Sequence, residues 1–132
     1  MAIVTGAAQL IGANHVRGLA NDGASVIVTD MKDCEGSVEA SEADVPDIDY
    51  MVHQCDVADE ASVQGMVDPV TDRIGQIDIF VNNAAFFVGL NREPFEEISI
   101  EEWERGLGVT LKGIFYVAEA AIPNNATQEL GR

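Results

Sequence analysis

The sequence predicts a single-domain α/β fold of three layers, in which helices cover both faces of a parallel sheet. Short apolar runs alternate along its 132 residues with segments whose apolar positions recur at helical spacing, which is typical of strand-helix-strand units. The β-branched run at residues 26–28 lacks polar alternation, as expected of a strand covered on both faces. We assign all 132 residues to one domain, because no linker or repeat divides them.

The first half of the pattern is clear. Residues 2–5 are predicted to form the first strand, and residues 10–20 the first helix, because their apolar positions share one helical face. Asp22 and Gly23 supply the turn that ends this helix. A second strand is predicted at residues 25–29.

The middle of the chain continues the alternation. Residues 33–44 are polar with a weak helical pattern, and a third strand is predicted at residues 49–55. A helix is predicted over residues 58–74, where Pro69 is expected to kink or shorten it. Residues 77–81 are expected to form a fourth, buried strand.

A long helix is predicted from Ser99 to about Ile122. Ser99 is a suitable N-cap, and acidic residues follow it in the first turn. Gly106, Gly108 and Gly113 lie inside this helix, where each costs about 1 kcal/mol relative to alanine. We therefore expect these glycines to pack closely against a neighbouring element.

Composition excludes several classes of function. The formal net charge is 7 − 23 = −16, which argues against nucleic-acid binding, because a phosphate backbone requires a basic face. No apolar run approaches the roughly 18 residues of a membrane span, and we expect a cytoplasmic protein. Cys34, Cys55, His15 and His53 lack metal-ligand spacing, so no metal site is predicted and the thiols are expected to be reduced.

The turn between the first strand and the first helix carries the functional signal. It reads Thr5-Gly6-Ala7-Ala8-Gln9-Leu10-Ile11-Gly12. A helix N-terminus offers unpaired N–H groups, so a strand that leads through a glycine turn into a helix predicts a pyrophosphate site. Asp30 ends the second strand and is suited to bind the ribose hydroxyls of NAD while repelling the 2′-phosphate of NADP. The alternative is that Gly6 and Gly12 only form a tight turn.

The sequence resembles the classical short-chain dehydrogenases/reductases over residues 2–122. Besides the glycine turn, Cys55-Asp56-Val57-Ala58-Asp59 is similar to the family's acidic motif, Asn82-Asn83-Ala84-Ala85 to its Asn-Asn-Ala-Gly motif, and Val109-Thr110-Leu111-Lys112-Gly113 to its long helix. The resemblance implies a Rossmann-type parallel sheet with strand order 3-2-1-4. It also implies a set of cofactor-binding residues: Thr5, Gly6, Ala8, Gln9, Leu10, Ile11, Gly12, Asp30, Asp56, Val57, Asn83, Ala84 and Ala85.

Three positions depart from the family pattern. Leu10 replaces the middle glycine, whose role is to let the backbone approach the pyrophosphate closely. Ala85 replaces another glycine, which is a mild change. Thr110 occupies the position of the catalytic Asn, and its hydroxyl lacks the paired donor and acceptor of a carboxamide.

The family's catalytic Ser and its Tyr-x-x-x-Lys pair have no counterpart in these residues. Tyr50 is followed four residues later by Gln54, and Tyr116 by Ala120. In the family, this Tyr acts as general acid/base while hydride passes between the nicotinamide and an alcohol or carbonyl substrate. We therefore expect the catalytic residues to lie beyond Arg132, and the 132-residue chain to be inactive by itself.

Two functions remain open from the sequence. The first is an NAD-dependent oxidoreductase of which this chain is the cofactor-binding part, and the second is a non-catalytic nucleotide-binding or partner-binding module. The resemblance implies a homo-oligomer with residues 99–122 at an interface. Phe86, Phe87 and Val88 form either a substrate wall or part of the core. The fourth strand would be an unprotected apolar edge in the isolated chain, so we expect poor solubility or self-association.

Overall fold

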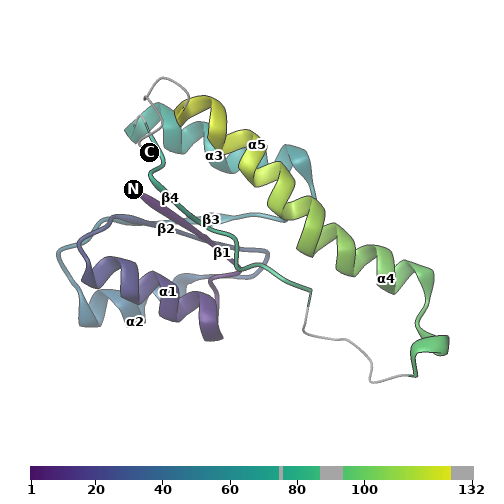
Figure 1. Ribbon diagram of the computed structural model, residues 1–132. Coiled ribbons are helices and arrows are strands. Elements are labelled where there is room, and N and C mark those ends of the chain that lie inside the picture. The colour runs from purple at the N-terminus through teal and green to yellow at the C-terminus, as the bar shows by residue number, and fades with distance from the viewer. Residues whose placement is uncertain (75, 87–93, 126–132) are drawn as a thin grey trace.

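The computed structural model describes residues 1–74, 76–86 and 94–125 (Figure 1). Four parallel strands form one sheet in the order β3-β2-β1-β4, as predicted. The strands are β1 (Ala2–Thr5), β2 (Val26–Asp30), β3 (Tyr50–Gln54) and β4 (Ile79–Val81). Parallel strands end at the same edge of a sheet, so the loops that follow β1, β2, β3 and β4 gather along one edge.

Helices cover both faces of the sheet (Figure 1). On one face lie α1 (Leu10–Asn21) and α2 (Glu35–Asp44), and on the other α3 (Glu60–Ile74) and α5 (Gly113–Asn125). The helix α4 (Ile100–Leu107) precedes α5 and extends beyond the sheet, after a short 3₁₀ turn η1 (Phe95–Glu97). The predicted three-layer α/β fold is confirmed.

The sheet separates two apolar clusters, which explains the absence of polar alternation in its strands. Ile3 and Ile27 belong to the cluster that includes side chains of α3 and α5, whereas Val4 and Val28 belong to the cluster under α1 and α2. All four side chains are fully buried. Burying an aliphatic side chain of this size contributes about 1.5–3 kcal/mol, so β1 and β2 anchor both layers.

The predicted long helix is present but not uniform. Ser99 caps it as predicted, because its Oγ accepts a hydrogen bond from the backbone N–H of Glu102 at 3.1 Å. Between α4 and α5 the chain forms a π-helical segment, η2 (Gly108–Lys112), which the sequence pattern does not reveal. A π segment offsets the helical faces on either side of it, and such segments are frequent at functional sites.

The expectation for the helix glycines holds at one position only. A Cβ atom on Gly113 would lie 2.8 Å from Cγ2 of Val57, so close packing explains this glycine. Gly106 has no neighbour within 4 Å, and Gly108 meets only the Cβ of Ala58 at 4.0 Å. The prediction of close packing is therefore wrong for Gly106.

Two further expectations differ from the structure. Pro69 does not shorten α3, which continues to Ile74. Its buried face, which includes Met66 and Val70, packs into the core, and this burial offsets the lost hydrogen bond. β4 is shorter and less buried than predicted, since Ile79 is 43% exposed, although its position at the edge of the sheet is the one expected for the isolated chain. Ile77 precedes β4 and is nonetheless buried.

Candidate functional site

The turn after β1 has a shape that only glycine fits at two positions. Gly6 has a φ of +65°, and a Cβ there would lie 2.8 Å from the Cα of Ala84. A Cβ on Gly12 would overlap the carbonyl oxygen of Gly6 and would also lie 2.8 Å from Nδ2 of Asn83. The glycines thus let the first turn of α1 pack against the loops after β1 and β4.

The N-terminus of α1 has no capping side chain. Gln9, the N-cap, is extended and its side chain makes no capping hydrogen bond, and the first turn contains no acidic residue. The first N–H groups of a helix lack partners inside the helix and carry a partial positive charge. In a chain with a net charge of −16, this uncapped turn is therefore a local site suited to an anion.

Thr5 and Asn83 fasten this turn to the end of β4. The Asn83 side-chain amide donates hydrogen bonds of 2.9 Å to the carbonyl oxygens of both Thr5 and Gly6. The Thr5 hydroxyl accepts the backbone N–H groups of Asn83 and Ala84, each at 3.1 Å, and its own donor faces the carbonyl oxygen of Val81 at 3.4 Å. The motif residue Asn83 therefore holds the turn in place.

Asp30 ties the end of β2 to the same turn. Its Oδ2 accepts the N–H of Ala8 at 3.1 Å, and its Oδ1 accepts the N–H of Lys32 at 3.0 Å. A carboxylate has about four acceptor positions, so both oxygens retain capacity for ribose hydroxyls. Asp30 thus has a structural role in addition to the binding role predicted for it.

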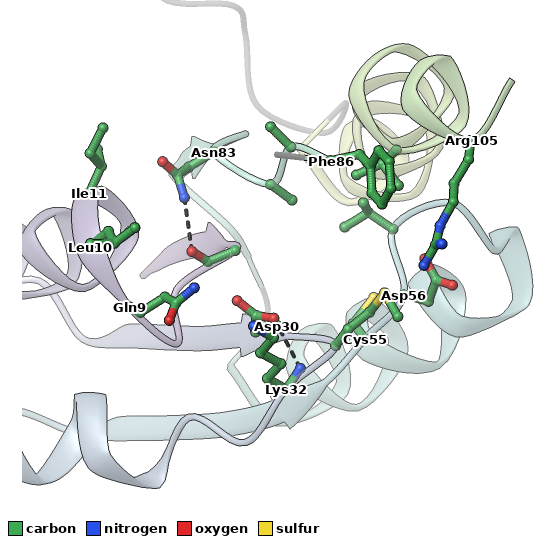
Figure 2. Close-up of a pocket in the computed structure, with 17 residues that line it drawn as sticks. Gln9, Leu10, Ile11, Asp30, Lys32, Cys55, Asp56, Asn83, Phe86 and Arg105 are labelled. Carbon is green, nitrogen blue, oxygen red and sulfur yellow. Dashed lines mark hydrogen bonds between the residues drawn. The ribbon is translucent and has the colours of Figure 1, made fainter. Parts of the chain in front are cut away.

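These loops enclose a crevice of about 550 Å³ at the carboxyl edge of the sheet (Figure 2). That volume lies within the range of roughly 300–1,000 Å³ that is usual for ligand sites. Most of the predicted cofactor-binding residues line it: Gly6, Gln9, Leu10, Ile11, Gly12, Asp30, Asp56, Val57, Asn83, Ala84 and Ala85. The remaining two, Thr5 and Ala8, do not line the crevice and act through the hydrogen bonds described above.

Six lining residues lie outside the predicted cofactor-binding set: Met31, Lys32, Cys55, Phe86, Arg105 and Val109. Cys55 and Val109 belong to the motifs quoted from the sequence, and Met31 and Lys32 directly follow Asp30, so adjacency was an available signal. Phe86 was expected in a substrate wall or in the core, and it lines the crevice, whereas Phe87 and Val88 lie outside the described residues. The contact between Phe86 and Arg105 arises from tertiary packing, and no spacing in the sequence indicates it.

Leu10 occupies the turn in a conformation that favours glycine. It is the non-glycine residue with positive φ, +54°, among the described residues, and its side chain is 68% exposed at the crevice. A left-handed conformation costs a residue with a Cβ roughly 1–2 kcal/mol. The leucine therefore adds both backbone strain and bulk at the point where a ligand would approach the helix.

Thr110, the predicted counterpart of the catalytic Asn, is placed differently from the cofactor-binding set. It lies in η2, and its side chain is exposed. The neighbouring Val109, rather than Thr110, lines the crevice. Its catalytic role therefore stays a prediction.

The crevice contains one thiol. Cys55 lines it but is buried, and this burial raises the pKa of its thiol, so Cys55 stays protonated at neutral pH and is a poor nucleophile. Cys34 is also buried and free. Within the described ranges, no group of three or more His, Cys, Asp or Glu residues is arranged to hold a metal ion.

Within residues 1–74, 76–86 and 94–125, no helix combines the length and the apolar character that crossing a bilayer requires.

A parallel sheet, a glycine turn that leads into an uncapped helix, and an acid at the end of the next strand define a dinucleotide-binding α/β protein. Residues 6–132 match the profile of the family described as enoyl-(acyl carrier protein) reductase. This profile belongs to the short-chain dehydrogenases/reductases. The chain is a member of the short-chain dehydrogenase/reductase family, an oxidoreductase family that binds nicotinamide dinucleotides.

Individual relatives agree with this assignment. D-threitol dehydrogenase from Mycolicibacterium smegmatis is 40% identical over 124 residues, which cover 91% of this chain and 45% of that protein. Trans-4-hydroxycyclohexanecarboxylate dehydrogenase from Sinomonas cyclohexanicum is 33% identical over 130 residues, with 93% and 49% covered. The chain thus spans about half the length of the curated relatives it matches.

Solved structures show the same fold. A metagenomic short-chain oxidoreductase in complex with NADP superimposes with a TM-score of 0.83 at 28% identity, over 96% of this chain and 56% of that one. A Serratia marcescens short-chain dehydrogenase/reductase mutant gives 0.81 at 30% identity, with 93% and 49% covered.

Proposed function

We propose that this chain is the NAD-binding part of an oxidoreductase that interconverts an alcohol and a carbonyl compound. The observation that carries the proposal is the uncapped first turn of α1, which faces the crevice beside Asp30. Its N–H groups would bind the pyrophosphate, and Asp30 would accept the ribose hydroxyls. Bound NAD would supply the hydride acceptor for alcohol oxidation.

We propose that the catalytic Ser and the Tyr-x-x-x-Lys pair of the complete protein lie beyond Arg132. No Tyr-x-x-x-Lys occurs in the 132 residues, and the similar proteins are about twice as long. Two of these relatives are named as dehydrogenases of a sugar alcohol and of a hydroxylated ring acid, which supports a hydroxylated substrate for the complete protein. Thr110 would stand at the position of the assisting Asn.

The preference for NAD over NADP rests on Asp30. A 2′-phosphate on the adenosine ribose would face a carboxylate whose two oxygens are fixed by the N–H groups of Ala8 and Lys32. One similar structure is an NADP complex, so the preference must be tested on this chain itself.

Isothermal titration calorimetry on the purified chain tests the binding proposal. NAD should give saturable one-to-one heat, and NADP should bind more weakly. Asp30→Ser removes the repulsion between the carboxylate and the 2′-phosphate, so it should bring the affinities for NAD and NADP closer together. Wild-type chain that binds NADP more tightly than NAD would refute the assigned preference, and chain that binds neither would refute the function.

A non-catalytic module is the second candidate. The strained Leu10 at the crevice and the exposed Thr110 both favour it, because each departs from the arrangement that catalysis would use. The complete coding sequence separates the two candidates, since an enzyme requires a Ser and a Tyr-x-x-x-Lys downstream in the same reading frame.

We also propose that the complete protein forms a homo-oligomer through α4 and α5. Exposed apolar side chains recur along α4, η2 and α5: Ile100, Trp103, Leu107, Leu111, Ile114 and Phe115. Soluble monomers rarely expose many large apolar side chains close together, and such exposure is typical of a protein interface. Light scattering should show self-association, and Leu111→Glu should shift the chain towards monomer; an unchanged monomer in both would contradict the proposal.

A further inference from the structure

The end of the crevice farthest from α1 is formed by an aromatic ring and a guanidinium group. Phe86 follows the motif after β4, and Arg105 projects from the last turn of α4. The guanidinium carbon of Arg105 lies 4.5 Å from the centroid of the Phe86 ring, within the range of a cation–π contact. Figure 2 shows these two side chains together on the side of the crevice opposite Leu10 and Ile11, near Asp56.

The stacked guanidinium keeps its hydrogen-bond donors available. Within the described residues, Arg105 forms no salt bridge, and its donors have no acceptor at hydrogen-bond distance. The carboxylate of Asp56, which Figure 2 shows beside Arg105, accepts the N–H of Ala58 at 2.9 Å. A guanidinium carries five N–H donors, and contact with an aromatic ring leaves these donors able to bind a ligand in the crevice.

Apolar and acidic residues share the other walls near this end. Met31, Val57 and Val109 line the crevice, and an adjoining hollow shared with α4 is also lined by the carboxylates of Asp56, Glu101 and Glu104. A flat heterocycle with ring nitrogens suits these surroundings, because its faces pack on aliphatic side chains while its nitrogens accept hydrogen bonds. Adenine has this chemistry.

We propose that Arg105, supported by Phe86, binds the adenine base of the dinucleotide. The inference rests on the proposed function, which places the pyrophosphate at α1 and the ribose at Asp30. The base attached to that ribose then extends away from α1, towards the end of the crevice formed by Asp56 and Arg105. Arg105 is thus a binding residue that lies outside the sequence motifs.

A 2′-phosphate is the competing ligand for the same guanidinium. Arginine is well suited to bind phosphate, but a 2′-phosphate would be attached to the ribose held by Asp30. The fixed carboxylate therefore favours a neutral base over a phosphate as the partner of Arg105.

Calorimetry on the 132-residue chain with adenosine 5′-monophosphate, nicotinamide mononucleotide and NADP tests the assignment. Arg105→Ala should weaken adenosine 5′-monophosphate binding about five- to tenfold and leave nicotinamide mononucleotide unchanged. Phe86→Leu should weaken the same ligand, and Arg105→Lys should restore little, because lysine lacks the planar stack. Arg73→Ala, on the exposed surface of α3, is the matched control, and thermal melting verifies that each variant is folded.

The outcomes separate this inference from the function beneath it. Equal binding of adenosine 5′-monophosphate by wild-type chain and Arg105→Ala overturns the inference alone, as does full rescue by Arg105→Lys or a loss confined to NADP. Wild-type chain that binds no ligand containing adenosine overturns the proposed function and the inference with it.

Discussion

The two ends of the crevice are built in different ways. At the α1 end, Thr5, Gly6, Asp30 and Asn83 are joined by a network of hydrogen bonds between side chains and backbone. At the other end, Phe86 and Arg105 come from separate segments and meet in one cation–π contact. We call the α1 end, where we propose that the pyrophosphate binds, the phosphate end, and the end with Phe86 and Arg105, where we propose that adenine binds, the adenine end. The comparison teaches that hydrogen bonds fix the phosphate end in the absence of a ligand, whereas the adenine end depends on the packing of α4.

The largest effect is expected from crowding the phosphate end. Gly12→Ala places a methyl group against the carbonyl oxygen of Gly6, which cannot move without breaking the contacts of Asn83. We expect a loss of about 1–3 kcal/mol in the free energy of unfolding and at least a tenfold loss of NAD affinity, measured by urea denaturation and calorimetry.

Gly18→Ala in the same helix is the control for that substitution. Gly18 has no neighbour within 4 Å, so alanine should stabilise α1 by about 0.5–1 kcal/mol and leave NAD affinity unchanged. If both variants had the same free energy of unfolding and the same NAD affinity, the close contact at Gly12 would contribute to neither.

Removing the link between β1 and β4 is expected to have the next largest effect. Asn83→Ala leaves the carbonyl oxygens of Thr5 and Gly6 without their side-chain donor, which should cost about 1–3 kcal/mol in chemical denaturation. Asn82→Ala, at an exposed neighbouring position, should change stability by less than about 0.5 kcal/mol. Similar losses at both positions would argue against the network.

Substitutions of Leu10 test whether this side chain limits NAD binding at the phosphate end. Leu10→Gly relieves the positive φ but makes the unfolded chain more flexible, so we expect a net gain of only about 0.5 kcal/mol. NAD affinity should rise several-fold because the backbone becomes accessible. Leu10→Ala is the control, because it removes the bulk of the side chain without relieving the backbone strain. Weaker NAD binding by Leu10→Gly than by the wild-type chain would contradict the role assigned to this side chain.

The smallest effect concerns pH and a thiol outside the crevice. Burial, with the charges of Asp30 and Asp33, raises the pKa of Cys34 from 9.0 to about 11. Its contribution to stability is therefore complete below about pH 9 and is lost as pH rises towards 11, because the unfolded thiol ionises first. Between pH 8 and 10.5, the free energy of unfolding measured with urea should fall less for Cys34→Ala than for the wild-type chain. An equal fall in both proteins would refute this prediction.

The same contrast explains what the sequence could predict. The strand order, the helix positions and most of the phosphate end follow from local patterns, because Thr5 to Gly12 form one continuous turn and Asp30 ends the adjacent strand. Gly6 and Gly12 stand out in the sequence because a turn of this shape requires glycine at both positions, where a Cβ would collide with neighbouring backbone atoms.

At the adenine end, the sequence motifs indicated Asp56 and Val57, but the contact between Phe86 and Arg105 was not predictable in the same way. The π-helical segment η2 offsets the faces of α4 and α5 relative to each other, and no periodicity in residues 108–112 indicates it. Arg105 meets Phe86 only after α4 has packed, so a sequence separation of 19 residues conceals the contact. The wrong expectation for Gly106 has the same origin, since α4 extends beyond the sheet.

A crystal structure of this chain grown with excess NAD tests the central claim most directly. The account predicts a diphosphate at the N–H groups of the first turn of α1, with ribose hydroxyls on Asp30. An empty crevice, with the Leu10 side chain filling the approach to Gly6 and Gly12, would contradict it.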